Sequence, residues 1–158
     1  MFKVGDRVVY PMHGAGIIEA IEEKEILGQK RQYYVMHLPM GDIKLMIPTD
    51  NVEETGLREV ISQEEVPKVL RILRERKVSM CSNWNRRYRA NLEKIKSGNI
   101  YEVAEVVRNL VLRERERGLS SGERRMLDSA RQILISELVL AQGKAEEEVA
   151  NLLDGLLA

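Results

Sequence analysis

The stretch RVVYPMHGAGIIEAIEEKEI, residues 7–26, decides how the chain begins to fold. A short β-branched run from Arg7 to Tyr10 ends at Pro11, and a longer apolar run extends from Gly16 to Ile26. Gly14-Ala-Gly16 lies between the two runs and is typical of a bend or a bulge, because glycine adopts backbone conformations that other residues avoid. The stretch therefore predicts two β-strands separated by a sharp change of direction.

Two more segments with strand character follow before residue 50. Tyr33 to Leu38 is apolar, Ile43 to Ile47 alternates between apolar and other residues, and Pro39-Met-Gly41-Asp42 between them is a turn signal. Short strands punctuated by glycine and proline indicate a small, strongly bent antiparallel barrel.

After Gly56 the apolar residues follow the helical repeat. The first predicted helix follows Ser62-Gln-Glu-Glu65, which has the form of a capping box, and continues through Leu73. Four further helices are predicted over about residues 84–96, 100–117, 121–142 and 145–157, with Asn83, Asn99 and Ser120 as N-caps and Gly98, Gly118 and Gly143 at C-terminal ends. Residues 76–82 are a predicted connecting segment.

The predicted fold class is therefore α+β. A β-barrel domain occupies residues 1–55, and an all-α helical bundle domain occupies residues 56–158. Neither domain is long enough for a large core, so each is expected to depend on close packing or on a partner.

The composition argues against several functional classes. There are only two histidines and one cysteine, too few for a Cys/His zinc site, and no GxxxxGK[ST] phosphate loop is present. Cys81 has no base near it in sequence, so we predict no enzyme activity and no cofactor. The chain has no apolar run of membrane-spanning length and no visible secretory signal, and a single cysteine fits a reducing compartment, so the expected location is the cytoplasm.

The net charge is zero, but the charges are unevenly distributed. Residues 71–96 carry nine Lys or Arg against two Asp or Glu, while the rest of the chain is acidic. This window contains the only tryptophan, Trp84, followed closely by Arg86, Arg87 and Arg89. A concentrated positive potential attracts polyanions, and an indole bordered by arginines is suited to wedging into DNA or stacking on a base.

A structural role for Trp84 is the main alternative. At about 100° per residue, Trp84, Tyr88, Leu92 and Ile95 share one stripe of the predicted helix, with the basic residues on its flanks. On that interpretation the indole is the end of a core stripe. Its place at the first helical residue favours the opposite, because a side chain there projects past the helix end, beside backbone N–H groups that suit a phosphate.

Four stretches carry a resemblance to a known family. They are FKVGDRVVYPMHGAG at residues 2–16, NWNRRYRANLEKIKSGN at 83–99, VAEVVRNL at 103–110 and ERGLSSGERRMLDSARQIL at 116–134. Together they resemble the CarD/CdnL family of bacterial transcription regulators, over essentially the whole chain. The N-terminal part resembles the RNA-polymerase-interacting domain that the family shares with the transcription-repair coupling factor.

The resemblance implies a Tudor-like N-terminal barrel that binds the RNA polymerase β subunit, and a helical module that contacts promoter DNA at the upstream edge of the melted −10 region. It implies that Trp84 wedges into the minor groove and lengthens the life of the open complex. The implied DNA-binding set is Trp84, Arg86, Arg87, Arg89, Asn83 and Lys94. The implied polymerase-binding set is Lys24, Ile26, Met46 and Pro48, with Met46 standing where some members have arginine.

A second function stays open from the sequence alone. The chain could be a protein–protein adaptor on RNA polymerase that makes no DNA contact, with Trp84 as a core residue or an interface anchor. Neither function involves a membrane or a small-molecule substrate.

Overall fold

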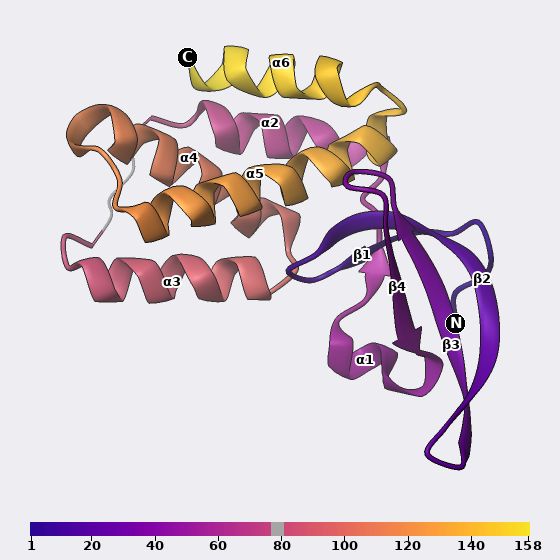
Figure 1. The fold of residues 1–158 in the computed structure, drawn as a ribbon. Helices are drawn as coiled ribbons and strands as arrows, with labels where there is room; N and C mark the ends of the chain where they lie inside the picture. Colours follow the sequence, from indigo (N-terminus) through magenta and orange to yellow (C-terminus); the bar gives the residue numbers. More distant parts are fainter. Residues whose placement is uncertain (77–80) are drawn as a thin grey trace.

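The computed structural model describes residues 1–76 and 81–158, which form an N-terminal sheet module and a C-terminal helical module (Figure 1). Residues 77–80 of the predicted connecting segment, which include Lys77 of the basic window, lie outside the described residues. The α+β fold class is confirmed.

The sheet module is one antiparallel sheet of five strands in the order β4-β3-β2-β1-β5. The strands are β1 (Arg7–Tyr10), β2 (Gly14–Ile26), β3 (Gln29–Leu38), β4 (Ile43–Pro48) and β5 (Arg58–Glu59). The barrel is not closed, because β4 and β5 are opposite edges of the sheet and do not pair. After β4 the chain becomes helical in η1 (Thr49–Asn51) and α1 (Val52–Thr55), and the two residues of β5 then pair with β1.

Gly14, Ala15 and Gly16, predicted to form a bend or bulge between two strands, lie inside β2 and pair in register with β1, and the irregularity of the strand comes just after them. The register between β2 and β3 shifts between Ile18 and Ala20, which is a β-bulge. A Cβ atom on Gly16 would lie 2.3 Å from the carbonyl oxygen of His37, so only glycine lets β3 approach this closely. The curved sheet encloses a small core of Val8, Ile18, Tyr34, Met36, Leu38, Ile47 and Leu57.

The helical module begins with η2 (Gln63–Glu65) and α2 (Val66–Arg74). It continues with α3 (Trp84–Lys96), α4 (Ile100–Arg117), α5 (Ser121–Gln142) and α6 (Glu146–Leu157). The side chains of Asn83, Asn99 and Ser120 accept backbone N–H groups at the starts of α3, α4 and α5, as predicted. Ser62 is different, because its hydroxyl lies near the Glu65 carboxylate and caps no backbone N–H.

The core of the helical module forms around α4, which packs against α2, α3 and α5, while α6 covers α2 and α5 (Figure 1). The buried side chains include Leu73, Ile100, Val107, Leu110, Leu134, Leu138 and Leu153. The two modules meet where α5 lies against β2. The predicted boundary after residue 55 falls before β5, whose two residues complete the sheet by pairing with β1.

Candidate nucleic-acid interface

The first turn of α3 is fixed by its cap. Asn83 has an extended backbone, and its side-chain oxygen accepts the N–H of Arg86 at 3.1 Å. Because asparagine satisfies a backbone donor in this position, the helix begins at the next residue. The cap therefore places Trp84 at the first helical position, at the end of the helix rather than along its side.

The indole of Trp84 is held in place and yet remains accessible. Its ring stacks on Tyr88, with centroids 5.1 Å apart and planes at 19°. The ring nitrogen Nε1 donates a hydrogen bond to Ser120 Oγ at 3.0 Å. Both rings lie over Gly122, where an added Cβ would only just touch them, and Trp84 still keeps 43% of its surface exposed. The indole therefore lies outside the buried core, in an orientation set by three neighbours.

Two of the three neighbouring arginines are available to an external ligand. Arg86 and Arg89 are exposed, and their guanidinium groups make no ion pair or hydrogen bond within the described part of the chain. Lys94 is less available, because its ammonium group pairs with Glu105 at 2.9 Å. Asn83 is exposed but uses its side-chain oxygen as the helix cap.

The sequence predicted that Arg87 lies on a flank of the apolar stripe of the helix. That prediction is wrong, because Arg87 is one of the buried residues of α3. Its side chain is 3% exposed and forms a two-pronged ion pair with Glu123 of α5, at 2.8 and 3.1 Å. A further guanidinium nitrogen donates to the carbonyl oxygens of Cys81 and Ser82, at 3.1 and 3.2 Å. Arg87 therefore joins the starts of α3 and α5, and its guanidinium group is buried among these contacts.

The electrostatics of this pair favour its charged form. The Arg87 guanidinium holds the pKa of the Glu123 carboxyl below its usual range, although burial acts in the opposite direction. The hydrogen bond to Glu123 likewise raises the pKa of Arg87 against the effect of burial. Both groups are ionised at neutral pH, so the junction is a buried salt bridge held by charge-assisted hydrogen bonds.

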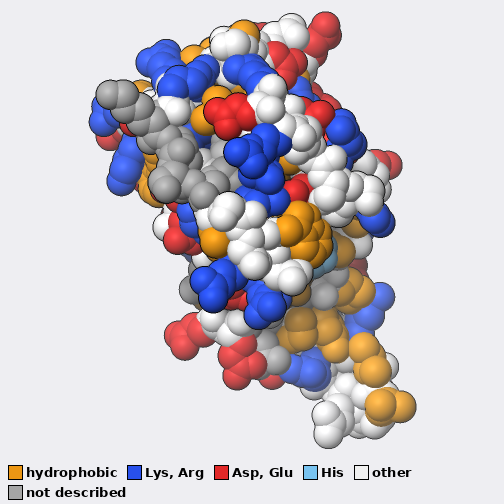
Figure 2. All heavy atoms as spheres, turned by 90° about the vertical axis from the view of Figure 1, so that its left-hand side faces the viewer, with side chains coloured by type: hydrophobic (Ala, Val, Ile, Leu, Met, Phe, Trp, Pro, Cys, Tyr) orange, Lys and Arg blue, Asp and Glu red, His pale blue; other side chains and the backbone are white. Residues whose placement is uncertain are grey.

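The surface around this junction is basic with apolar patches between the charges. Figure 2 faces the end of the helical module at which α3 and α5 begin and α4 ends, and Lys and Arg side chains gather there around hydrophobic ones. The exposed arginines on these helix ends are Arg86, Arg89, Arg115, Arg117, Arg124 and Arg125. Of these, Arg124 is paired with Glu114 at 3.0 Å. The arrangement suits a polyanion that also offers a flat apolar surface.

Sequence reasoning missed three residues of this arrangement. The helical spacing puts Tyr88 on a core stripe, and it gives Ser120 and Glu123 no role beyond a capping box. One signal for Arg87 was present: Arg87, Asn91 and Ile95 are spaced by four, and all three are buried. Had the buried face of the helix been assigned to residues 87, 91 and 95, Arg87 would have been predicted to pack against the neighbouring helices.

The predicted polymerase-binding residues share one face of the sheet. Met46 is paired with Val35, and Pro48 with Tyr33. Val35 and Tyr33 pair in turn with residues 20 and 22 of β2. Side chains alternate between the two faces of a strand, so Lys24 and Ile26 lie on the same face of the sheet as Met46 and Pro48. Ile26 and Met46 expose 52% and 40% of their surfaces, and Lys24 is exposed. The four residues thus form one accessible surface of basic and apolar groups.

Other kinds of site find little support in the described residues. Across residues 1–76 and 81–158, no three His, Cys, Asp or Glu side chains gather closely enough to hold a metal ion. None of the helices in these ranges combines the length and apolar character needed to cross a bilayer.

The structure is an open sheet joined to a helical bundle, and each module has an accessible surface of basic and apolar side chains. Comparison with known proteins identifies its family. Residues 2–61 match the CarD-like/TRCF RID domain, and residues 68–154 match the CarD C-terminal domain. The chain belongs to the CarD family.

One curated relative and one solved structure illustrate the similarity. The chain is 43% identical over 151 residues to the Bacillus subtilis (strain 168) protein named "Putative transcription factor YdeB", covering 96% of this chain and 99% of that protein. It is 37% identical to the 72-residue N-terminal domain of Myxococcus xanthus CarD, solved by solution NMR, covering 37% of this chain and 79% of that one with a TM-score of 0.33.

Proposed function

We propose that this protein regulates transcription by binding RNA polymerase through its sheet module and promoter DNA through the start of α3. Membership of the CarD family supports a role in transcription regulation through an interaction with RNA polymerase. We further propose that the protein partner is the polymerase β subunit and that the DNA site is the upstream edge of the −10 bubble. The expected result is a longer-lived open complex.

The observation that carries the DNA contact is the exposed indole of Trp84. It is backed by Tyr88 and bordered by the guanidinium groups of Arg86 and Arg89, which have no ion pair among residues 1–76 and 81–158. A wedge must be rigid, because a freely rotating ring would lose conformational entropy when it inserted between bases. Stacking on Tyr88 and the hydrogen bond to Ser120 have already removed much of that freedom.

The mechanism requires no chemistry. Separating stacked bases costs about a few kcal/mol per step, and a protein that binds the opened DNA better than the intact duplex offsets part of this cost. The equilibrium moves only by the difference between the two affinities, and about 1.4 kcal/mol of difference changes the ratio of open to closed complexes roughly tenfold. Because the net charge is zero, we expect weak binding to free DNA, with tethering to polymerase raising the local concentration.

Recognition of DNA sequence is not part of the proposal. Arg86 and Arg89 are placed to contact phosphates, which position a protein without reading bases. The preference for one promoter position is expected to come from the distorted shape of melted DNA.

The polymerase contact is tested by two charge reversals on the β2–β3 hairpin. Lys24→Glu changes the predicted binding face, while Lys30→Glu changes an exposed residue that the strand register places on the opposite face. We expect Lys24→Glu to lose co-purification with RNA polymerase and Lys30→Glu to keep it. Equal retention by the two variants would contradict the assignment of this face.

An adaptor that binds a second protein instead of DNA is the alternative function. Binding of the whole protein to a forked DNA, followed by tryptophan fluorescence, separates the two. A DNA-bound indole should be quenched by base stacking and protected from acrylamide, whereas an adaptor would leave Trp84 emission unchanged by DNA.

A further inference from the structure

The sheet module holds the C-terminal end of α3. Gly98, in the turn between α3 and α4, has φ +73°, and a Cβ atom there would lie 2.8 Å from Cγ of Pro11. The carbonyl oxygen of Gly98 accepts a hydrogen bond from Nε of Arg58 at 2.8 Å. The corner after β1 and the short strand β5 therefore both contact the turn that ends the candidate DNA-binding helix.

The same guanidinium also binds α5. Arg58 donates two hydrogen bonds to the carboxylate of Glu137, at 2.8 and 2.7 Å, and Glu137 is 1% exposed. Glu137 also accepts the backbone N–H of Ile61 at 2.9 Å. A single planar group thus joins β5, the middle of α5 and the end of α3, and its fork fixes both distance and angle.

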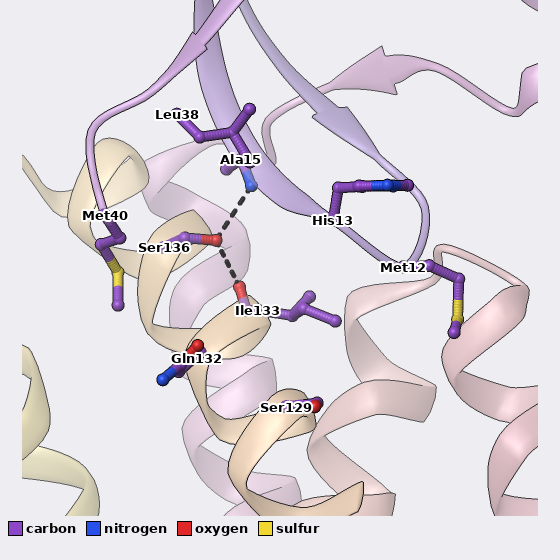
Figure 3. A pocket seen from close by; sticks show the side chains of 9 residues that line it. All are labelled: Met12, His13, Ala15, Leu38, Met40, Ser129, Gln132, Ile133 and Ser136. Carbon is purple, nitrogen blue, oxygen red and sulfur yellow. Dashed lines mark hydrogen bonds between the residues drawn. The ribbon is translucent and has the colours of Figure 1, made fainter. Parts of the chain in front are cut away.

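Two contacts on either side of Glu137 extend this junction along α5. The N–H of Ala15 donates to Ser136 Oγ at 2.9 Å, and that hydroxyl donates to the carbonyl of Ile133 at 2.7 Å (Figure 3). One helical turn further on, Arg7 donates to the carbonyl of Leu140 at 2.5 Å. The junction therefore contacts successive turns of one helix, which resists rotation as well as separation.

We propose that Arg58 and Glu137 are positioning residues, which set where Trp84 lies relative to the polymerase-binding face; this inference rests on the proposed function. Trp84 and Gly98 lie at opposite ends of α3, which has 13 residues and is therefore about 20 Å long. A tilt of about 10° at the Gly98 end would move the indole by about 3 Å, roughly the rise of two helical residues.

This geometry matters only when both modules are bound at once. Tethering raises affinity by roughly 10² to 10⁴ when the linked sites can be engaged together, and that gain is lost when their geometry does not match. A loosened junction should therefore leave polymerase binding and DNA binding intact when each is measured alone. It should weaken the simultaneous binding of polymerase and DNA by one molecule.

The test uses the double variant Arg58→Met/Glu137→Met in the full chain. Replacing both charges avoids an unpaired buried ion, and such replacements are often tolerated by the fold. The matched control is Arg131→Met, which removes an ion pair between α5 and α6, 3.0 Å from Asp154 and within the helical module. The measurements are polymerase binding, forked-DNA binding and open-complex lifetime, with a thermal melt to establish folding.

We expect the double variant to bind polymerase and forked DNA separately as the wild type does. Its increase in open-complex lifetime should be smaller than the wild-type increase by about tenfold or more. The control should keep all three properties. A double variant with the full lifetime increase would overturn the positioning role and leave the proposed function standing. A wild type with no lifetime effect would instead contradict the proposed function itself.

A direct distance measurement also tests the junction in the wild type, where no substitution can disturb folding. Spin labels on the exposed Cys81, close to the start of α3, and on a Leu27→Cys hairpin tip report the relative placement of the modules. The wild-type chain should give one narrow distance distribution, and the double variant a broader one. A broad distribution in the wild type would overturn the inference.

Discussion

Arg87→Met should destabilise the fold rather than simply remove a phosphate contact. The substitution keeps most of the aliphatic stem but removes the guanidinium, leaving the Glu123 carboxylate with a side-chain exposure of only 2% and without its partner. Removing one member of a buried pair typically costs about 3–5 kcal/mol, because the remaining charge is neither hydrated nor neutralised. The carbonyls of Cys81 and Ser82 also lose their donor.

The expected cost corresponds to a large change in melting temperature. For a chain of this size, each kcal/mol lowers Tm by about 2–4 °C, so the variant should melt roughly 6–20 °C below the wild type. Differential scanning calorimetry at neutral pH measures this directly. The double variant Arg87→Met/Glu123→Met is the control, and it should recover much of the loss because no charge is left buried.

The pH dependence gives a second check on the same pair. The pKa of Glu123 is lowered in the folded state by its hydrogen bonds to Arg87, so the pair stabilises the fold fully above the pKa of the unfolded chain. That contribution is lost as the pH falls below the ordinary glutamate value of 4.5 and through the lower pKa of the folded state. The double methionine variant should lack this part of the acid sensitivity. An Arg87→Met variant with an unchanged Tm and a weaker, less salt-dependent DNA affinity would refute the reasoning and restore Arg87 as a phosphate ligand.

Four other substitutions test separate parts of the structure. Arg86→Ala and Arg89→Ala should each reduce the slope of log affinity for forked DNA against log salt by about 1, measured by fluorescence anisotropy, and an unchanged slope would remove that residue from the phosphate contact. Ser120→Ala removes both the cap of α5 and the acceptor of the indole, so we expect a loss of about 1 kcal/mol in urea unfolding and a change in Trp84 emission. Gly16→Ala should destabilise the sheet module by about 1–3 kcal/mol or more, because a Cβ would lie 2.3 Å from a backbone oxygen, and a stable variant would contradict the packing of β2 on β3.

The parts of the fold that depend on neighbouring residues could be predicted from the sequence. Asn83, Asn99 and Ser120 each bond to a backbone group two or three residues away, and all three caps are confirmed. The alternation of residues 43–47 predicted β4. These features need no knowledge of the rest of the molecule, since their partners are close in sequence.

The parts that depend on distant partners could not be predicted. Arg87 has a long charged side chain with a good reason to lie in solvent, and its partner Glu123 is 36 residues further along the chain. The failure of the barrel to close has a similar origin. Whether β4 meets β5 depends on how the segment from Thr49 to Thr55 packs, and the apolar pattern of the strands does not specify that.

The exposed position of Trp84 also required the structure. The sequence supported both a core stripe and a projecting ring, because Tyr88 and Leu92 continue the stripe with helical spacing. In the structure these two side chains are only partly buried, and the fully buried positions of α3 are Arg87, Asn91 and Ile95. The helix is rotated so that its polar stripe faces the bundle, which leaves the aromatic pair at the boundary with solvent.

The most direct test of the central claim is the lifetime of open promoter complexes formed by RNA polymerase with the wild type, Trp84→Ala or Trp84→Phe. We expect the wild type to lengthen the lifetime and the alanine variant to lose most of this effect while still folding and binding polymerase. The phenylalanine variant should keep part of it. Equal lifetimes with wild type and Trp84→Ala would show that the indole does not stabilise the open complex.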